Sequence, residues 1–219
     1  MLRVISDVHG KFRNYEKITK SCDKSIQVGD MGFDYSYLNK HIDPKKHKFF
    51  KGNHDLYTEH QDAKPHHLLK DFGMIDEYPI FIIRGAWSID WLYRTPGFDW
   101  FTNEELSENE FDQCLEEYKK VKPNIVLSHT CPQEVKLDIL DNCDTLSNGK
   151  DYLTRTELRL QDMFSYHRPH LWVFGHWHIK YNKNFNGTKF LCTPELGYVD
   201  IDIEELYVKD SLHKDAATQ

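Results

Sequence analysis

The stretch Leu2-Arg3-Val4-Ile5-Ser6-Asp7-Val8-His9-Gly10 decides the fold class of this chain. It begins as a short β-rich run, and side chains that can ligate a metal follow the run directly. The same order recurs four times along the chain. Ile26–Val28 leads to Gly29-Asp30, Lys48–Lys51 to Gly52-Asn53-His54-Asp55, Ile125–Leu127 to Ser128-His129, and Leu171–Phe174 to Gly175-His176-Trp177-His178.

Helix-like stretches separate several of these predicted strands. The spacing of apolar residues predicts amphipathic helices over Phe12–Cys22, Phe111–Val121 and Leu153–Phe164. Further strands are expected over Tyr78–Ile83, Lys189–Cys192 and Tyr198–Ile203. Alternation of strands and helices indicates an α/β fold.

Length and composition are those of one ordinary globular domain. A chain of 219 residues, 39% hydrophobic and 14% aromatic, can bury one sizeable core. We expect one domain over residues 1–208. The polar tail, residues 209–219, is predicted to be disordered.

Charge and cysteine content exclude several classes of protein. The net charge is −7 and basic residues are scattered, which speaks against extended binding along a nucleic acid but leaves a small nucleotide substrate open. The five cysteines form no C-x-x-C pair, which fits a reducing cytosol. Without a leader or an 18-residue apolar run, the sequence predicts a cytoplasmic protein that has no membrane partner. The oligomeric state stays open.

The polar clusters after the five strands predict one shared site. In α/β sheets, ligands gather outside the carboxyl ends of the strands, where the loops converge. The mixed nitrogen and oxygen donors favour divalent transition ions such as Mn, Fe, Zn or Ni over calcium. The candidate ligands are Asp7, His9, Asp30, Asn53, His129, His176 and His178.

These five clusters, in this order, resemble the motifs of the calcineurin-like metallophosphoesterase family, and the aromatic segment 85–100 is similar to one found in a subset of its small bacterial and phage members. Any one motif would be weak, and isolated residues of these types are usually surface or turn residues, but five in sequence are specific. The resemblance implies a four-layer αββα sandwich with two mixed β-sheets. It also implies hydrolysis of a small phosphomonoester or phosphodiester, nucleotides among them.

The resemblance further implies a dinuclear metal centre. Manganese is the first choice, with Fe, Zn, Ni or Co as alternatives, and a hydroxide that bridges the two ions would be the nucleophile. One ion would be held by Asp7, His9, Asp30 and His178, and the other by Asp30, Asn53, His129 and His176.

Three further residues receive roles beside the metals. His54 is expected to protonate the leaving group, and Asp55 to orient this imidazole and raise its pKa. Arg94 and Asn53 are expected to contact the substrate. Gly29, Gly52 and Gly175 each precede a ligand, where we expect a backbone conformation that other residues avoid.

The aromatic segment 85–100 has two interpretations. It could be a packed loop over the core, or a lid beside the metals in which Arg94 binds a phosphate and an aromatic ring stacks on a base. The pair His66-His67 matches no motif and is treated as surface or structural residues. The protein serine/threonine phosphatases follow their second motif with an Asp-Arg pair, whereas Met31 follows Asp30 here, which speaks against activity on phosphoproteins.

Two other classes of function remain as alternatives. A non-catalytic scaffold on the same fold would be expected to have lost ligands, and this chain retains the full set. A nuclease would share the chemistry, but the sequence lacks a basic track.

Overall fold

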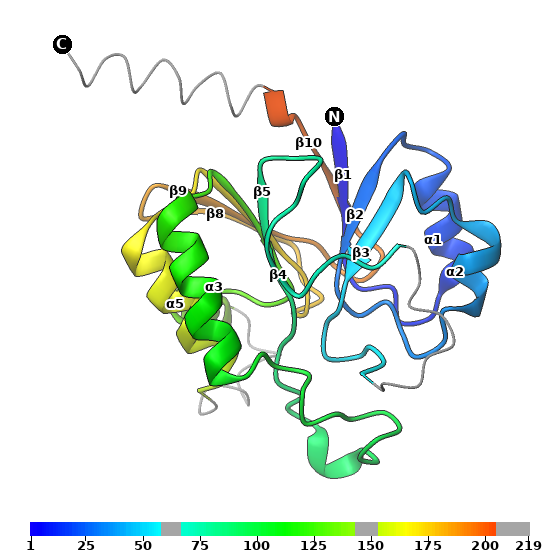
Figure 1. Ribbon diagram of the computed structural model, residues 1–219, viewed down its shortest axis with the longest axis horizontal. Coiled ribbons are helices and arrows are strands. Elements are labelled where there is room, and N and C mark those ends of the chain that lie inside the picture. Colours follow the sequence, from blue (N-terminus) through cyan, green and yellow to red (C-terminus); the bar gives the residue numbers. More distant parts are fainter. Residues whose placement is uncertain (58–66, 143–152, 205–219) are drawn as a thin grey trace.

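The computed structural model describes residues 1–57, 67–142 and 153–204 of the chain (Figure 1). The elements are β1 (Leu2–Ile5), α1 (Phe12–Thr19), β2 (Ser25–Val28), α2 (Ser36–His41), β3 (His47–Phe50), β4 (Phe72–Met74), β5 (Ile80–Ile83), the 3-10 helix η1 (Trp91–Tyr93), α3 (Glu108–Val121), β6 (Ile125–Ser128), α4 (Gln133–Asp141), α5 (Arg155–Tyr166), β7 (Leu171–Phe174), β8 (Tyr181–Phe185), β9 (Thr188–Cys192) and β10 (Tyr198–Ile201).

The strands form two mixed sheets. One sheet has the order β10-β1-β2-β3, and the other has the order β4-β5-β6-β7-β9-β8. Strands β1, β2 and β3 are parallel to one another, and so are β5, β6, β7 and β9. Antiparallel strands occupy the edges at β10, β4 and β8. Parallel neighbours matter for the site, because their carboxyl ends lie at the same edge of a sheet.

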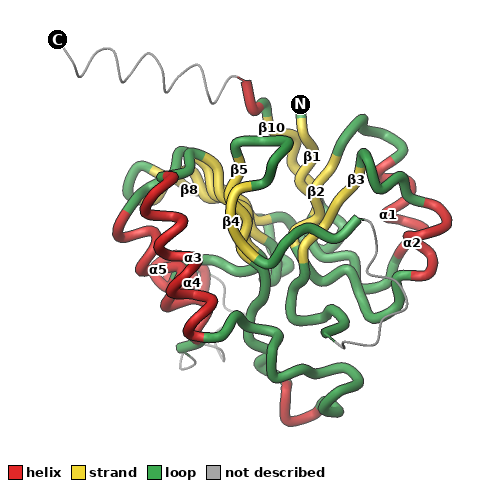
Figure 2. The backbone as a smooth tube through the Cα atoms, viewed as in Figure 1, coloured by secondary structure: helices red, strands yellow, loops and turns green. Residues whose placement is uncertain are grey.

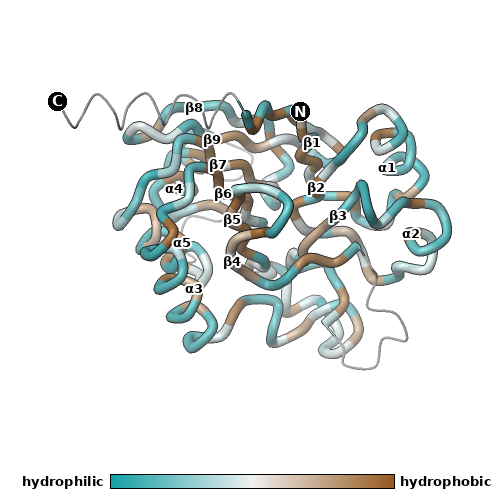
Figure 3. Tube along the Cα trace, turned by 45° about the horizontal axis from the view of Figure 1, so that its top comes forward, coloured by the Kyte–Doolittle hydropathy of each residue, from teal (hydrophilic) through white to brown (hydrophobic). Residues whose placement is uncertain are grey.

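Helices cover the outer faces of both sheets, so the chain has four layers. In Figure 1, α1 and α2 lie on one side of the strands and α3 and α5 on the other, and Figure 2 shows the same separation of helices from strands. Figure 3 shows hydrophobic residues concentrated along the central strands. The predicted αββα sandwich with two mixed sheets is confirmed.

Successive side chains of a central strand enter two different cores, one between the two sheets and one between a sheet and its helices. In β7, Leu171 and Val173 enter the core between the sheets, together with Val4 of β1. Trp172 and Phe174 point the other way and join the core beneath the helices α3, α4 and α5. Because successive side chains of a strand point to opposite faces, a strand buried on both faces is apolar throughout.

The predicted helices differ from the observed ones mainly at their ends. Helix α3 begins three residues before the predicted Phe111, after a capping box made by Ser107 and Glu110. Helix α5 begins after a second capping box, made by Thr154 and Glu157, rather than at Leu153. Helices α2 and α4 and strands β4 and β8 were not predicted, since each is short and lacks a clear periodic pattern.

Three expectations concern parts of the chain that fall outside the described residues. The predicted domain end at residue 208, the tail 209–219 and His66 all lie there. Among the residues that are described, none of the helices has the length and apolar character needed to cross a membrane.

Candidate metal centre

Five parallel strands deliver the seven candidate ligands to one place between the sheets. Asp7 and His9 follow β1, Asp30 follows β2 and Asn53 follows β3; the second sheet contributes His129 after β6, and His176 and His178 after β7. The carboxyl ends of the two sheets therefore converge, and residues far apart in the chain become neighbours.

Two groups of potential ligand atoms result. Asp7, His9, Asp30 and His178 each offer one atom within 4.8 Å of the others, and so do Asp30, His129 and His176. Asn53 completes the second group, since its Oδ1 lies 3.0 Å from both His129 Nε2 and His176 Nδ1.

Asp30 is common to both groups and turns one oxygen toward each. Its Oδ1 lies 3.1 Å from His129 Nε2, and its Oδ2 lies 3.6 Å from His9 Nε2. In the first group, His178 Nε2 lies 3.4 Å from Asp7 Oδ1 and 3.0 Å from His9 Nε2. The two oxygens of Asp30 thus face different groups, which is the arrangement that a carboxylate shared by two ions requires.

Backbone strain concentrates at the same residues. His9, Asp30, His176 and His178 have φ angles of +47°, +61°, +68° and +53°. Non-glycine residues rarely adopt this left-handed conformation, which costs about 1–3 kcal/mol per residue and is typical of functional sites. The turns that follow the strands thus hold these side chains in a geometry that packing alone does not favour.

The glycines before the ligands are needed for two different reasons. Gly29 has a φ of +95°, which confirms the predicted conformational requirement there. Gly52 and Gly175 lie outside the left-handed region, so the expectation is wrong for them. At Gly52 a Cβ would lie 2.3 Å from Asp30 Oδ1, and at Gly175 it would lie 2.7 Å from Asp7 Oδ2. Space beside the carboxylates, rather than φ, excludes a side chain at these two positions.

Hydrogen bonds from outside the two groups orient the ligands. The ring of His129 places Nδ1 2.8 Å from the carbonyl oxygen of Val28 and Nε2 3.1 Å from Asp30 Oδ1. Burial would lower the pKa of His129, but the charge of Asp30 and its hydrogen bond outweigh burial and raise this pKa to about 9. A ring that donates from Nδ1 to Val28 would present its Nε2 lone pair to a cation beside Asp30. Asp7 accepts from the backbone N of His176 at 2.9 Å, which ties the loop after β7 to that after β1.

The two buried aspartates differ electrostatically from free side chains. Burial on its own would raise their pKa values, but neighbouring histidines outweigh it and hold both pKa values below the usual range. The histidine that acts on Asp30 is His129, and those that act on Asp7 are His178 and His129. Both carboxylates are therefore ionised at neutral pH and available to cations.

His54 lies at the edge of the two groups, beside Arg94. Its ring centroid is 4.9 Å from that of His9, and its Nδ1 is 3.2 Å from Arg94 Nη1. Burial, with a contribution from the charge of Arg94, lowers the pKa of His54 to about 4. Arg94 itself is held by Asp90, through contacts of 2.7 and 2.9 Å.

The predicted role of Asp55 is wrong. Its carboxylate turns away from His54 and accepts hydrogen bonds from the backbone N atoms of Asp30, Met31, Gly32 and Gly52 and from the hydroxyl of Tyr35. The reason is that the loops after β2 and β3 leave backbone donors without partners in the sheet, and a buried carboxylate can accept several of them. Asp55 organises the loops rather than the imidazole.

The aromatic segment 85–100 combines features of both interpretations. Trp87, Trp91 and Trp100 pack against one another with centroids 5.7–6.5 Å apart, as a packed loop would. Tyr93 and Phe98, however, are 92% and 74% exposed. The segment projects away from the sheets around η1 in Figure 1, and it carries Arg94 to His54.

Two buried residues of this region were missed in the sequence. Ser88 Oγ accepts a hydrogen bond from Asn53 Nδ2 at 3.1 Å and donates one to Glu104 Oε2 at 2.7 Å. Burial raises the pKa of Glu104 to about 7, although its hydrogen bonds with Ser88 act in the opposite direction. No spacing rule relates these three positions, so a sequence signal for them is lacking.

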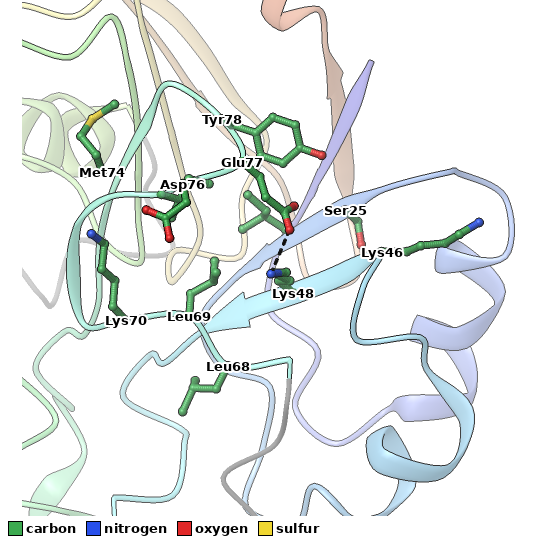
Figure 4. Close-up of a pocket in the computed structure, with 12 residues that line it drawn as sticks. Ser25, Lys46, Lys48, Leu68, Leu69, Lys70, Met74, Asp76, Glu77 and Tyr78 are labelled. Carbon is green, nitrogen blue, oxygen red and sulfur yellow. Dashed lines mark ion pairs between the residues drawn. The ribbon is translucent and has the colours of Figure 1, made fainter.

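A separate cavity of about 290 Å³ opens at the opposite ends of β2 and β3 (Figure 4). Its lining includes Ser25 at the start of β2, and the ion pair between Lys48 and Glu77 at 3.2 Å. His67, expected to be a surface or a structural residue, is buried in this half of the molecule, and its Nε2 lies 2.8 Å from the carbonyl oxygen of Ile42, which fits the structural alternative. Neither feature adjoins the candidate metal centre.

Comparison with known families gives the decisive match. The model of the calcineurin-like phosphoesterases matches residues 2–180, which include all seven candidate ligands. The chain belongs to this family. It is accordingly a metal-dependent phosphoesterase, and the family implies a dinuclear centre of divalent ions. No curated protein matches the chain.

Solved structures similar to this calcineurin-like phosphoesterase are distant in sequence. A phosphopantetheinyl hydrolase from Mycobacterium tuberculosis is 14% identical, with 89% of each chain covered and a TM-score of 0.46. A predicted phosphoesterase from Streptococcus pneumoniae is 14% identical, with 89% of this chain and 71% of that one covered and a TM-score of 0.39. A putative 5'-nucleotidase from Staphylococcus aureus is 13% identical, with 92% and 51% covered and a TM-score of 0.45.

The residues that meet at the centre fit a pair of divalent ions. The donors are carboxylate and amide oxygens and imidazole nitrogens, which suit transition ions. Both aspartates are fully buried, and two buried like charges this close to each other call for cations to balance them.

Proposed function

We propose that this phosphoesterase hydrolyses small phosphate monoesters or diesters, nucleotides among them, and that it works with two divalent ions, Mn²⁺ in the first place. The observation that carries this proposal is the position of Asp30. Its two carboxylate oxygens lie 3.1 Å from His129 and 3.6 Å from His9, in the two separate groups of ligand atoms. A shared carboxylate is what a dinuclear site needs.

Seven side chains would hold the ions. One ion would be held by Asp7, His9, Asp30 and His178, and the other by Asp30, Asn53, His129 and His176, which is supported by their mutual approach. When bound, divalent ions offset the charge of phosphoryl oxygens and lower the pKa of water.

His54 and Arg94 would act on the substrate from the open side. His54 would protonate the leaving oxygen, and an anionic substrate beside the ring would favour its protonated form. Arg94 would bind a phosphate oxygen, since its guanidinium is held by Asp90 within reach of His54. The proposal includes a single domain over residues 1–208 and a cytoplasmic location, on the sequence arguments given above.

The test is metal-dependent turnover. The protein is stripped with a chelator, Mn²⁺ is restored, and hydrolysis of nitrophenyl phosphate and bis(nitrophenyl) phosphate is measured, followed by cyclic and linear nucleotides. Turnover should return with the metal and should be lost in Asp30→Asn, whereas Asp162→Asn on the exposed face of α5 should match the wild type.

Several outcomes would contradict the proposal. Turnover without metal, or none across the whole panel, would count against a phosphoesterase of this kind. Tight binding of a protein partner with no bound metal would favour the scaffold, and salt-sensitive binding of an oligonucleotide would favour the nuclease.

A further inference from the structure

The side chain of Asn53 separates two different environments. Its Oδ1 lies 3.0 Å from His129 Nε2 and from His176 Nδ1, and its Nδ2 donates to Ser88 Oγ at 3.1 Å. Only the oxygen of a carboxamide can ligate a cation, because the NH₂ group is a donor. The affinity of this group for a metal therefore depends on which way the amide points.

Ser88 can impose that direction because its hydroxyl has a single hydrogen. Its Oγ donates to Glu104 Oε2 at 2.7 Å, and its backbone N donates to Glu104 Oε1 at 2.6 Å. Once the hydrogen points to the carboxylate, Oγ can only accept from its other neighbour, which is the NH₂ group of Asn53. The exposed fractions of Asn53, Ser88 and Glu104 are 2%, 1% and 1%, so water has little access to replace these contacts.

The backbone of Glu104 is itself held in place. Its carbonyl oxygen accepts from the hydroxyl of Tyr57 at 3.3 Å, and a Cβ on Gly85 would lie 2.2 Å from this oxygen. Arg84 donates to the carbonyl oxygen of Asn103 at 2.9 Å. Tyr57 and Arg84 thus fix the backbone of Asn103 and Glu104, which follows the segment that carries Arg94. The Glu104 carboxylate reaches Ser88 from this fixed backbone.

We propose that Glu104 and Ser88 are positioning residues that set the direction of the Asn53 amide and thereby the metal affinity of the group formed by Asp30, Asn53, His129 and His176. This inference rests on the proposed function for the identity of the ligands. It adds a chain of three polar contacts that determines whether one of those ligands presents oxygen or hydrogen to the cation.

Glu104→Gln reverses the chain without changing its shape. The amide oxygen of the new side chain still accepts from the backbone N of Ser88, so its NH₂ group faces Oγ. The hydroxyl hydrogen of Ser88 then turns toward Asn53, which must rotate its oxygen to Ser88 and its NH₂ group to the metal. Loss of such an outer partner typically weakens metal affinity 10- to 100-fold. We expect a loss of about this size for one of the two Mn²⁺ ions.

A second substitution should reverse the effect. In the Glu104→Gln background, Asn53→Asp can accept the hydroxyl of Ser88 with one oxygen and face the cation with the other. The double variant should therefore bind the second Mn²⁺ more tightly than Glu104→Gln alone. In the wild-type background, Asn53→Asp instead places two carboxylates around one hydroxyl hydrogen, so the two substitutions should be strongly coupled.

Glu105→Gln is the matched control. Glu105 is the neighbouring buried carboxylate and accepts from the backbone N and Oγ1 of Thr156, at 2.8 and 2.9 Å. Its substitution also removes a buried charge, but it does not reach the ligands. It should lower the melting temperature and leave Mn²⁺ affinity unchanged.

The measurement is calorimetric titration of metal-free protein with Mn²⁺ at pH 8.5, where Glu104 is ionised, with far-UV circular dichroism as the check on folding. Ser88→Ala leaves the NH₂ group of Asn53 without its acceptor and should also weaken the binding of one Mn²⁺ ion. This variant replaces Glu104→Gln as the test if Glu104→Gln does not fold. Unchanged affinity in Glu104→Gln, or in Ser88→Ala if that variant has to serve, would overturn the inference. So would a double variant no better than Glu104→Gln. Two bound Mn²⁺ ions without any phosphoesterase activity would overturn only the proposed function, and a wild-type protein that binds no Mn²⁺ would overturn both.

Discussion

At the scale of the residue, the neighbours of His54 determine the position of its backbone and its ring. Its backbone N donates to Asp30 Oδ1 at 2.7 Å, so the residue that follows a candidate ligand is tied to the centre of the site. Its ring lies edge-on to that of His9 and next to the guanidinium of Arg94. In the proposed function this ring protonates the oxygen that leaves phosphorus, and His54 is not a member of either group of ligand atoms.

His54→Ala should therefore retain the metals and lose turnover. We expect kcat to fall about 10²- to 10⁴-fold with phenyl or alkyl phosphates, whose leaving oxygen needs a proton, and much less with nitrophenyl phosphate. The measurement is kcat for the ester series together with metal content by mass spectrometry. His41→Ala, at the exposed end of α2, is the control, and an equal loss for all esters would remove the acid role from His54.

Residue patterns predicted which side chains meet, but not how each is turned. The seven candidate ligands could be found because a strand end places its polar residues at a defined edge of the sheet. Arg94 was found differently, as the cation of the aromatic segment 85–100, where it follows the 3-10 helix η1 rather than a strand. Asp55 stands in the same motif, yet its orientation depends on backbone donors of the loop after β2, which sequence does not reveal. Ser88 and Glu104 escaped notice because their contacts join positions with no periodic relation.

At the scale of the element, Asp55 joins the loops that follow β2 and β3. It is fully buried and accepts from four backbone N atoms, of which Gly52 N at 2.7 Å is the nearest. Burial and the charge of Asp30 raise the pKa of Asp55 to about 7, so at higher pH the ionised form collects these donors. The loops that present Asp30 and Asn53 therefore share one acceptor.

Asp55→Asn should destabilise the fold even in the absence of metal. The new NH₂ group must face backbone donors, and we expect a loss of about 2–4 kcal/mol in the free energy of unfolding. Urea unfolding in EDTA at pH 8.5 measures this loss. Asp34→Asn is the control: Asp34 is exposed in the loop after β2 and accepts from Ser36 N at 2.8 Å, so its loss should be small. A change below about 1 kcal/mol in Asp55→Asn would contradict the account.

Strands were predicted more accurately than helices for a physical reason. The buried parallel strands such as β7 are apolar throughout and end at polar residues, which gives two signals at once. The starts of α3 and α5 depend on capping boxes, which the apolar period does not mark, although Ser107-x-x-Glu110 and Thr154-x-x-Glu157 are visible as a pattern.

At the scale of the whole molecule, the candidate centre joins the two sheets. Asp7, His9, Asp30 and Asn53 come from the sheet of β1, β2 and β3, and the remaining three ligands come from the sheet of β6 and β7. Elsewhere the sheets meet through apolar side chains such as Val4 and Val173. The division of the strands between two sheets was predicted from the family resemblance and not from periodicity, because a buried strand has the same apolar pattern in either sheet.

Metal removal should consequently lower the stability of the whole fold, because ions bound by both sheets stabilise the native state relative to the unfolded chain. At a free Mn²⁺ concentration 100 times the dissociation constant, one ion adds about 2.7 kcal/mol, which corresponds to a rise of about 5–10 °C in Tm for a chain of this size. Thermal unfolding of the stripped protein against Mn²⁺ concentration measures this rise. Because Asp30 faces both groups, Asp30→Asn should abolish most of the rise, whereas His178→Ala should leave the part due to the second group. A Tm that is independent of Mn²⁺ in the wild type, or a full rise in Asp30→Asn, would show that the two sheets are not joined through this centre.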